Sequence, residues 1–236
     1  MVFWIILFLL IVGIAFILAY RSMKDYQEIP RNSKVEYGLF LIRKTENFNV
    51  NILNSIGKLI FNEGFVISIE RLFKGHQAAL TIFGPKKILD EFTTELDLLE
   101  LEDYTLALKV LEISVWEVGV KDNKNLNIDS PNNIFMNLSE LGDEDQFFWQ
   151  VILGVGKEGE NLTFQTQIRA VVYSKDPSRK KVLTSSLQEL KQGELTKIPK
   201  PFSTEQMMDF YHLRVLSKDS SGPILNSEGI IRLLKV

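Results

Sequence analysis

The chain contains no cysteine and only two histidines, and both scarcities restrict its chemistry. Without a thiol, it can form no disulfide bond and can use no cysteine nucleophile. His76 falls at the start of a predicted strand beside a hairpin turn, where an exposed or structural position is the default. His212 stands three residues after Asp209, and one histidine cannot form a zinc site alone. The sequence therefore predicts no metal centre.

Motifs that bind phosphate or perform hydrolysis are also missing. Segment 154–160 is glycine-bearing but lacks the first glycine of a P-loop, and Glu158 stands where Ser or Thr should follow Lys157. Segment 142–146 lacks the later ligands that a calcium loop needs. No H-E-x-x-H or G-x-S-x-G sequence occurs. The sequence thus predicts a protein that is not an enzyme, holds no cofactor and hydrolyses no ATP.

A strong net charge is lacking as well, since the formal net charge is −3. This balance gives no sign of nucleic-acid binding. Charge is nevertheless uneven, because residues 90–103 hold seven acidic and no basic side chains, and residues 175–200 hold seven basic and three acidic ones. The default interpretation is two solvated helix faces, and the alternative is a docking surface for a charged partner. The candidate protein-contact residues are Arg179, Lys180, Lys181, Asp90, Glu91 and Glu95.

One long apolar segment stands at the start of the chain. Residues 1–20 carry no charged side chain, and at about 1.5 Å per residue a helix of this length spans the roughly 30 Å of a bilayer core. Arg21 and Lys24 follow, so the positive-inside rule places the C-terminal side in the cytoplasm. A cleaved signal peptide is the alternative, but no basic residue precedes the segment. We therefore predict a single-pass anchor in the cell membrane with a cytoplasmic C-terminal domain.

Hydrophobic periodicity predicts a repeated arrangement after a polar stalk at 21–34. The expected elements of the first unit are a strand at 35–43, a helix at 48–63, strands at 65–73 and 76–83, a helix after Pro85 and a strand at 98–104. This order is typical of a ferredoxin-like unit. The same order, starting with a strand at 105–118, is predicted to run again over residues 105–200. The expected domains are thus 35–104 and 105–200.

The last segment, 201–236, is predicted to be a C-terminal helix and a loosely attached tail. Ser203 and Gln206 have the spacing of a capping box, so a helix should begin at Ser203. The predicted fold class is α+β, with an N-terminal transmembrane helix, two tandem ferredoxin-like units and this C-terminal helix. The aromatic side chains of Phe147, Phe148 and Trp149 are expected in the core.

Several short segments occur in a recognisable order. They are YGLFLIRK at 37–44, the hairpin at 65–87, the Asp103-Tyr104 pair, GDEDQFFWQVIL at 142–153 and FSTEQMMDFYHL at 202–213. This order resembles the N-terminal, membrane-anchored region of type IV secretion-like ATPases, related to conjugative coupling proteins, of candidate-phylum bacteria. The resemblance covers most of residues 1–215 but includes no motor domain, so it implies location and role without ATPase activity.

These features predict a non-catalytic assembly or coupling module of a type IV secretion-like or DNA-transfer machine. Its partner would be a protein such as a motor ATPase or a secretion subunit, with a homo-oligomer as a further option, and no direct nucleic-acid binding is expected. The alternative is a membrane-tethered sensor that binds a small ligand between the two units. A hydrolase that uses dispersed carboxylates is a weaker third hypothesis.

Overall fold

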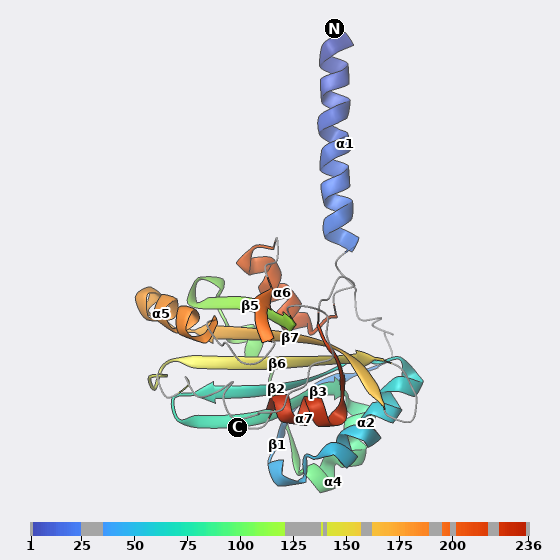
Figure 1. Cartoon of the computed structure of the whole chain (residues 1–236), viewed down its shortest axis with the longest axis vertical. Coiled ribbons are helices and arrows are strands. Elements are labelled where there is room, and N and C mark those ends of the chain that lie inside the picture. Colours follow the sequence, from blue (N-terminus) through green and yellow to red (C-terminus); the bar gives the residue numbers. More distant parts are fainter. Residues whose placement is uncertain are drawn as a thin grey trace.

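The centre of the protein is one antiparallel β-sheet with helices packed on its faces (Figure 1). The computed structural model describes residues 2–24, 35–120, 138, 141–156, 162–188, 195–198, 202–216 and 222–234. Its strands are β1 (Tyr37–Ile42), β2 (Ile67–Lys74), β3 (Gln77–Pro85), β4 (Leu98–Leu101), β5 (Ile113–Val120), β6 (Gln146–Val155), β7 (Thr163–Tyr173), β8 (Leu195–Ile198) and β9 (Ile224–Asn226). Eight strands follow the order β4-β1-β3-β2-β6-β7-β5-β8, and β9 pairs with β7.

The predicted fold class is wrong, because the two halves of the chain form one sheet and not two tandem ferredoxin-like units. Strands β2 and β6 pair from Ile67 opposite Leu153 to Lys74 opposite Gln146. The strand order β4-β1-β3-β2 of the first half is repeated as β8-β5-β7-β6 in the second, and β2 and β6 join the halves. Backbone hydrogen bonds therefore run without interruption across both halves.

The two faces of the sheet are covered differently. The face with Ile69 and Val151, called the core face below, packs against α2 (Val50–Glu63), α3 (Lys86–Leu89), the 3-10 turn η2 (Asp90–Phe92), α4 (Thr93–Leu96), α5 (Pro177–Gln188) and α7 (Ser227–Leu234). The opposite face, called the α6 face, packs against α6 (Thr204–Leu213). Strand alternation sends neighbouring residues to these two faces in turn.

Local sequence determines where the first core-face helix begins and ends. The Asn49 side chain accepts hydrogen bonds from the backbone N–H groups of Asn51 and Ile52, at 2.9 and 3.2 Å, which caps the start of α2. Gly64 ends the helix with a φ of 69°, a conformation that glycine adopts without strain. Ile56, at the centre of the buried stripe, is fully buried.

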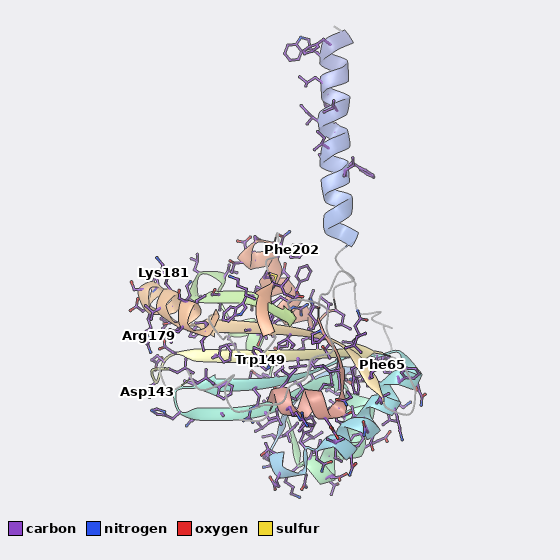
Figure 2. All side chains as sticks on the ribbon, in the orientation of Figure 1. Phe65, Asp143, Trp149, Arg179, Lys181 and Phe202 are labelled. Atoms are coloured by element: carbon purple, nitrogen blue, oxygen red, sulfur yellow. The ribbon has the colours of Figure 1, made fainter. Side chains whose placement is uncertain are left out.

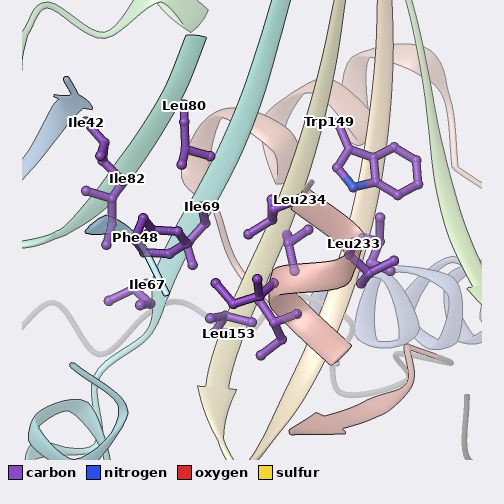
Figure 3. Close-up of a cluster of buried hydrophobic side chains, with 14 of the residues drawn as sticks. Ile42, Phe48, Ile67, Ile69, Leu80, Ile82, Trp149, Leu153, Leu233 and Leu234 are labelled. Carbon is purple, nitrogen blue, oxygen red and sulfur yellow. The ribbon is translucent and has the colours of Figure 1, made fainter. Parts of the chain in front are cut away.

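The C-terminal segment is a structural part of the core, which corrects the prediction of a loosely attached tail. Helix α7 buries Ile230 and Leu233 completely. Figure 3 shows Leu233 and Leu234 against the sheet beside Trp149 and Leu153. The tail therefore supplies core side chains that the first and second halves share. The aromatic run is confirmed as core, since Phe147, Phe148 and Trp149 are all buried.

Helix α1 (Val2–Lys24) contains the apolar N-terminal segment and stands apart from the sheet in Figure 1. Crossing a bilayer requires about 20 consecutive apolar residues. Among the residues that the structure describes, no helix is long and apolar enough to meet that requirement. This finding contradicts the predicted transmembrane anchor at residues 1–20 and the predicted localisation in the cell membrane. Most of the predicted stalk, residues 25–34, lies outside the described residues.

We expect the two halves of the sheet to unfold together. Ile69 of β2 and Val151 of β6 are fully buried opposite each other. Ile69→Ala should lower the free energy of unfolding by about 2–5 kcal/mol, because it leaves a cavity at the joint. The measurement is denaturant unfolding followed by tryptophan fluorescence, since Trp116 and Trp149 lie in the second half.

The exposed Thr94→Ala variant is the control, and its midpoint should stay unchanged. Two separate transitions, with the tryptophan signal unaffected by Ile69→Ala, would show instead that the halves are independent.

Candidate functional site

A row of buried polar side chains crosses the α6 face of the sheet. Thr81 of β3, Glu70 of β2, Gln150 of β6, Arg169 of β7 and Glu117 of β5 lie directly opposite one another in successive strand pairs. All five are buried, and four of them are fully buried. Burying a charged or hydrogen-bonding side chain is costly unless it has partners. The burial of these side chains therefore depends on their hydrogen-bond and ion-pair partners.

The C-terminal end of α6 supplies several of those partners. Arg169 donates to the backbone carbonyl oxygens of Phe210 at 2.8 Å and Val215 at 2.6 Å. The Gln150 side-chain amide donates to the carbonyl oxygen of Tyr211 at 3.1 Å. The last carbonyl groups of a helix have no partner within the helix, and they attract cations. The polar row thus binds the C-terminal end of α6 through hydrogen bonds.

Helix α6 is built for this position by its own sequence. The predicted capping box is confirmed, because Ser203 and Gln206 exchange side-chain to backbone hydrogen bonds at 3.0 and 3.2 Å. At the other end, Arg214 adopts a left-handed conformation with a φ of 52°. That turn ends the helix and directs Arg214 toward the sheet, where its guanidinium lies 4.4 Å from the centroid of the Phe83 ring.

Arg214 is the centre of a buried ion-pair network. Its guanidinium donates to Glu70 at 2.8 Å and to Asp103 at 2.7 Å, while its own side chain is 1% exposed. A third donation, at 3.0 Å, reaches the carbonyl oxygen of His212 near the end of α6. Arg214 thereby joins three parts of the chain: strand β2, the segment after β4 and helix α6.

Hydroxyl groups complete the network around Glu70. Tyr104 donates to Glu70 at 2.8 Å and shares a short hydrogen bond with the hydroxyl of Tyr211. Ser68 donates to the same carboxylate at 2.6 Å. Glu70 therefore receives hydrogen bonds from four side chains, when those of Arg214 and Gln150 are included. A carboxylate with so many donors is held in its charged form.

The pKa values follow from this competition between burial and partners. Burial alone would raise the pKa of the Glu70 carboxyl, but the charge of Arg214 and the hydrogen bonds outweigh it and lower that pKa. The Asp103 carboxyl behaves likewise, with burial opposed by Arg214 and Thr105, and its pKa is also lowered. Burial lowers the pKa of Arg169 to about 10, so it stays protonated at neutral pH. Burial also raises the pKa values of Tyr104 and Tyr211 well above the usual range.

In the second half of the row, Gln167 of β7 connects Arg169 with Glu117. Gln167 accepts a hydrogen bond from Arg169 at 2.9 Å and donates one to Glu117 at 2.7 Å. Within the described part of the chain, no three His, Asp or Glu side chains are placed to hold a metal ion. The donors and acceptors of this arrangement attach α6 to the sheet.

The sequence pattern did not predict this network. Ser68, Glu70 and Gln167 alternate with apolar residues along β2 and β7, and such alternation is typical of a solvent-facing side. Charged side chains on several strands that were predicted to be half-buried could have indicated a buried polar network. The Asp103-Tyr104 pair was a second indication, although the sequence did not reveal its role. Of the two histidines, His212 lies in the network through a hydrogen bond between its ring and Thr105.

The predicted acidic contact residues lie in two short elements and not in one continuous helix. Asp90 and Glu91 belong to η2 and Glu95 to α4, and all three side chains are exposed. The apolar residues Leu89 and Leu96 of the same segment are fully buried on the core face. The acidic residues are thus presented on a firmly packed segment beside β4.

The predicted basic contact residues on α5 are in part occupied within the chain. Arg179 forms an ion pair of 2.9 Å with Asp145, and Lys180 donates to the carbonyl oxygen of Leu111. Lys181 is exposed, and Figure 2 shows it with Arg179 at the outer end of the molecule. The acidic and basic groups are not brought together within one molecule, because α4 contacts β4 at one edge of the sheet and α5 lies near β5 at the other.

No family model matches this chain, and no curated protein matches it. Its function must therefore be inferred from the arrangement of its own residues.

We expect acid to destabilise the protein through Glu70 and Asp103. Their folded-state pKa values lie below the ordinary values of 4.5 and 3.8, so both carboxylates contribute fully to stability above those values. The contribution is lost as the pH falls through the lowered pKa values. Denaturant unfolding between about pH 6 and about pH 3 should show this loss, and Glu70→Gln should reduce it.

Glu205→Gln, an exposed change at the start of α6, is the matched control and should leave the pH dependence intact. If Glu70→Gln and the native chain lost equal stability over this range, Glu70 would not be the titrating group.

We also expect Arg169→Met to loosen α6 selectively. The change keeps an apolar stem but removes the donors to Phe210 and Val215, leaving buried carbonyl groups unpaired. Hydrogen exchange of the α6 backbone amides should accelerate about tenfold or more, while that of α2 should change little. Arg43→Met, which breaks an exposed ion pair with Asp97, is the control. Uniform acceleration across both helices would contradict a selective role.

Proposed function

We propose that this chain is a non-catalytic assembly module that acts through protein contacts. The observation that carries the proposal is the crossover between β4 and β5, residues 102–112, which is attached at both ends and yet presents apolar side chains to solvent. The alternating pattern of the sequence predicted a strand from residue 105 onward. The strand begins only at Ile113, and two 3-10 turns, Tyr104–Ala107 and Val110–Glu112, precede it.

The first end of the crossover is attached to the polar network. Asp103 pairs with Arg214, and Tyr104 donates to Glu70. Thr105 is buried, and its hydroxyl bonds both Asp103 and the His212 ring. These contacts involve three successive residues, so the chain leaves the network in a defined direction.

The second end is attached to the base of α5. The backbone N–H of Ser174 donates to the carbonyl oxygen of Glu112 at 3.0 Å, and Lys180 donates to that of Leu111. Ile113, the next residue, is buried against α6. The crossover therefore has fixed points on both sides of its exposed part.

Between these points, Leu106 is 74% exposed and Leu111 is 87% exposed. Burying one leucine side chain stabilises a protein by about 1.5–3 kcal/mol, and a segment held in place cannot turn both inward. Single exposed leucines are ordinary. We propose that the two on this fixed segment, with Ala107 exposed between them, make one contact surface. We call Leu106, Ala107 and Leu111 the crossover surface.

Charge around the crossover surface indicates the chemistry of its partner. The Lys109 side chain is 77% exposed, and its only ion pair among the described residues is a long one of 3.9 Å to Glu112. Lys180 lies at Leu111 through its hydrogen bond. A protein surface with apolar side chains surrounded by acidic ones would complement this arrangement. The resemblance to the anchored region of coupling ATPases makes a motor ATPase or a secretion subunit the partner class that we propose.

The test is site-specific photocrosslinking in cells. A crosslinking amino acid at position 106 or 111 should capture one and the same protein, whereas one at the exposed position 94, on the other edge of the sheet, should not. With that protein purified, Leu106→Glu or Leu111→Glu should weaken its binding about tenfold or more. Lys109→Glu should mainly slow association at low salt. Capture that is equal from all three positions, or affinity unchanged by both leucine variants, would reject the proposal.

A further inference from the structure

The sheet has two open edges. Strand β4 pairs with β1 and strand β8 pairs with β5, and no described residue pairs with the outer side of either strand. An open edge presents unpaired backbone N–H and C=O groups, which can pair with a strand of another chain.

The directions of these edges suit head-to-tail addition. All seven neighbouring pairs from β4 to β8 are antiparallel, so β4 and β8 run in opposite directions. If β4 of one copy lies beside β8 of the next, the alternation continues unbroken. Antiparallel pairing needs no other change in either strand.

The side chains at the two edges are complementary when the strand register is followed across the sheet. One row runs through Glu100, Phe40, Ile82, Ile69, Val151, Ile168, Val118 and Lys197. It ends in an acidic residue on β4 and a basic residue on β8, both on the core face. The neighbouring row runs through Leu99, Leu41, Thr81, Glu70, Gln150, Arg169, Glu117 and Ile198. It ends in two apolar residues on the α6 face.

We infer that copies of this chain associate by edge-to-edge strand pairing, with β4 of one copy beside β8 of the next. In that register, Glu100 faces Lys197 of the next copy and Leu99 faces its Ile198. Glu100 forms an ion pair of 2.7 Å with Lys86 of its own chain, but its side chain is still 55% exposed and can contact a second cation. Leu99 is 45% exposed, so both residues are accessible for such pairing. Cross-strand pairs of opposite charge and of apolar side chains both stabilise a sheet.

The helices beside the edges support the same arrangement. The acidic segment with Asp90, Glu91 and Glu95 and the basic helix α5 pack on the same core face, near opposite edges. Edge pairing would place the acidic segment of one copy next to α5 of its neighbour. Arg179 is already paired with Asp145, so Lys181 is the α5 residue that is exposed for this contact.

Pairing of β4 with a second β4 is disfavoured by the same residues. That symmetric arrangement would bring Glu100 near another Glu100, and like charges on neighbouring strands are destabilising. A β4-to-β8 contact is heterologous, so it builds a ring or an open chain of copies and not a closed dimer. The inference deepens the proposed function, on which it rests, by naming a second copy as a partner at a second surface.

Engineered cysteines test the geometry, because the native chain contains none. Residues directly opposite on antiparallel strands lie within disulfide range. Mixing Leu99→Cys with Ile198→Cys should give a disulfide-linked heterodimer, and the double variant should give a ladder of oligomers. Each single variant should crosslink at least fivefold less. A pair at exposed helical positions, Glu63→Cys with Ser185→Cys, controls for random collision.

A charge exchange tests the register. Glu100→Lys and Lys197→Glu should each raise the dissociation constant for self-association about two- to tenfold at low ionic strength, and the combined variant should restore it. Analytical ultracentrifugation measures the constants. Failure of the combined variant to restore association would reject the register.

The outcomes separate this inference from the proposed function. If Leu99→Cys alone crosslinked as strongly as the mixture, the pairing of β4 with β8 would be rejected in favour of symmetric pairing of β4 with β4. If the mixture and the control pair crosslinked equally, edge pairing would be rejected. Capture of a partner from positions 106 and 111 would in either case leave the assembly function standing.

Discussion

The carbonyl oxygens at the C-terminal end of α6 need hydrogen-bond donors, and the sheet supplies them. Arg169 and Gln150 reach two of these groups, those of Phe210 and Tyr211, from the middle of the α6 face, and Arg169 also reaches the carbonyl group of Val215 just after the helix. The dependence is mutual, because Arg169 and Glu70 could not be buried in a sheet without α6 and Arg214 above them. The second half of the sheet, the helix and the crossover are consequently parts of one arrangement.

A buried network of this kind is weak evidence for stability in itself. Removing two charges from water costs several kcal/mol each, and well-packed apolar side chains often serve stability as well. What a network provides, on our hypothesis for this protein, is a single register for α6. An apolar patch would allow the helix to bind in several positions, whereas Arg169 and Arg214 donate hydrogen bonds to carbonyl groups at fixed places. A uniform contact surface on the neighbouring crossover would require such a defined position.

Local signals in the sequence predicted most strands of the sheet, the hairpin of β2 and β3 and the capping box of α6, because turns, caps and alternation act over a few residues. They could not predict that β2 would pair with β6, since either strand could equally have remained an edge. Burial of the polar positions of β2 and β7 could not be predicted either, because nothing local shows that α6 covers them. The sequence also predicted a strand over Leu106 and Leu111, because Leu106, Leu108 and Val110 alternate with other residues, whereas the structure has 3-10 turns there.

The single sheet has a consequence for how contacts at different places could influence one another. The crossover surface is attached through Tyr104 and Asp103 to the network that holds α6, and the same row continues through Glu70 toward the outer residue Leu99 of β4. Coupling between distant sites requires a contiguous structure that both sites bias. Here the structure is a hydrogen-bonded row of eight strands, with buried charges that tolerate little displacement. A change at an edge that shifted β2 relative to β6 would disturb the pairing of Glu70 with Gln150, and with it the support of both α6 and the crossover. The pairing of β2 with β6 therefore connects the proposed contacts at the edges of the sheet with the proposed contacts at the crossover.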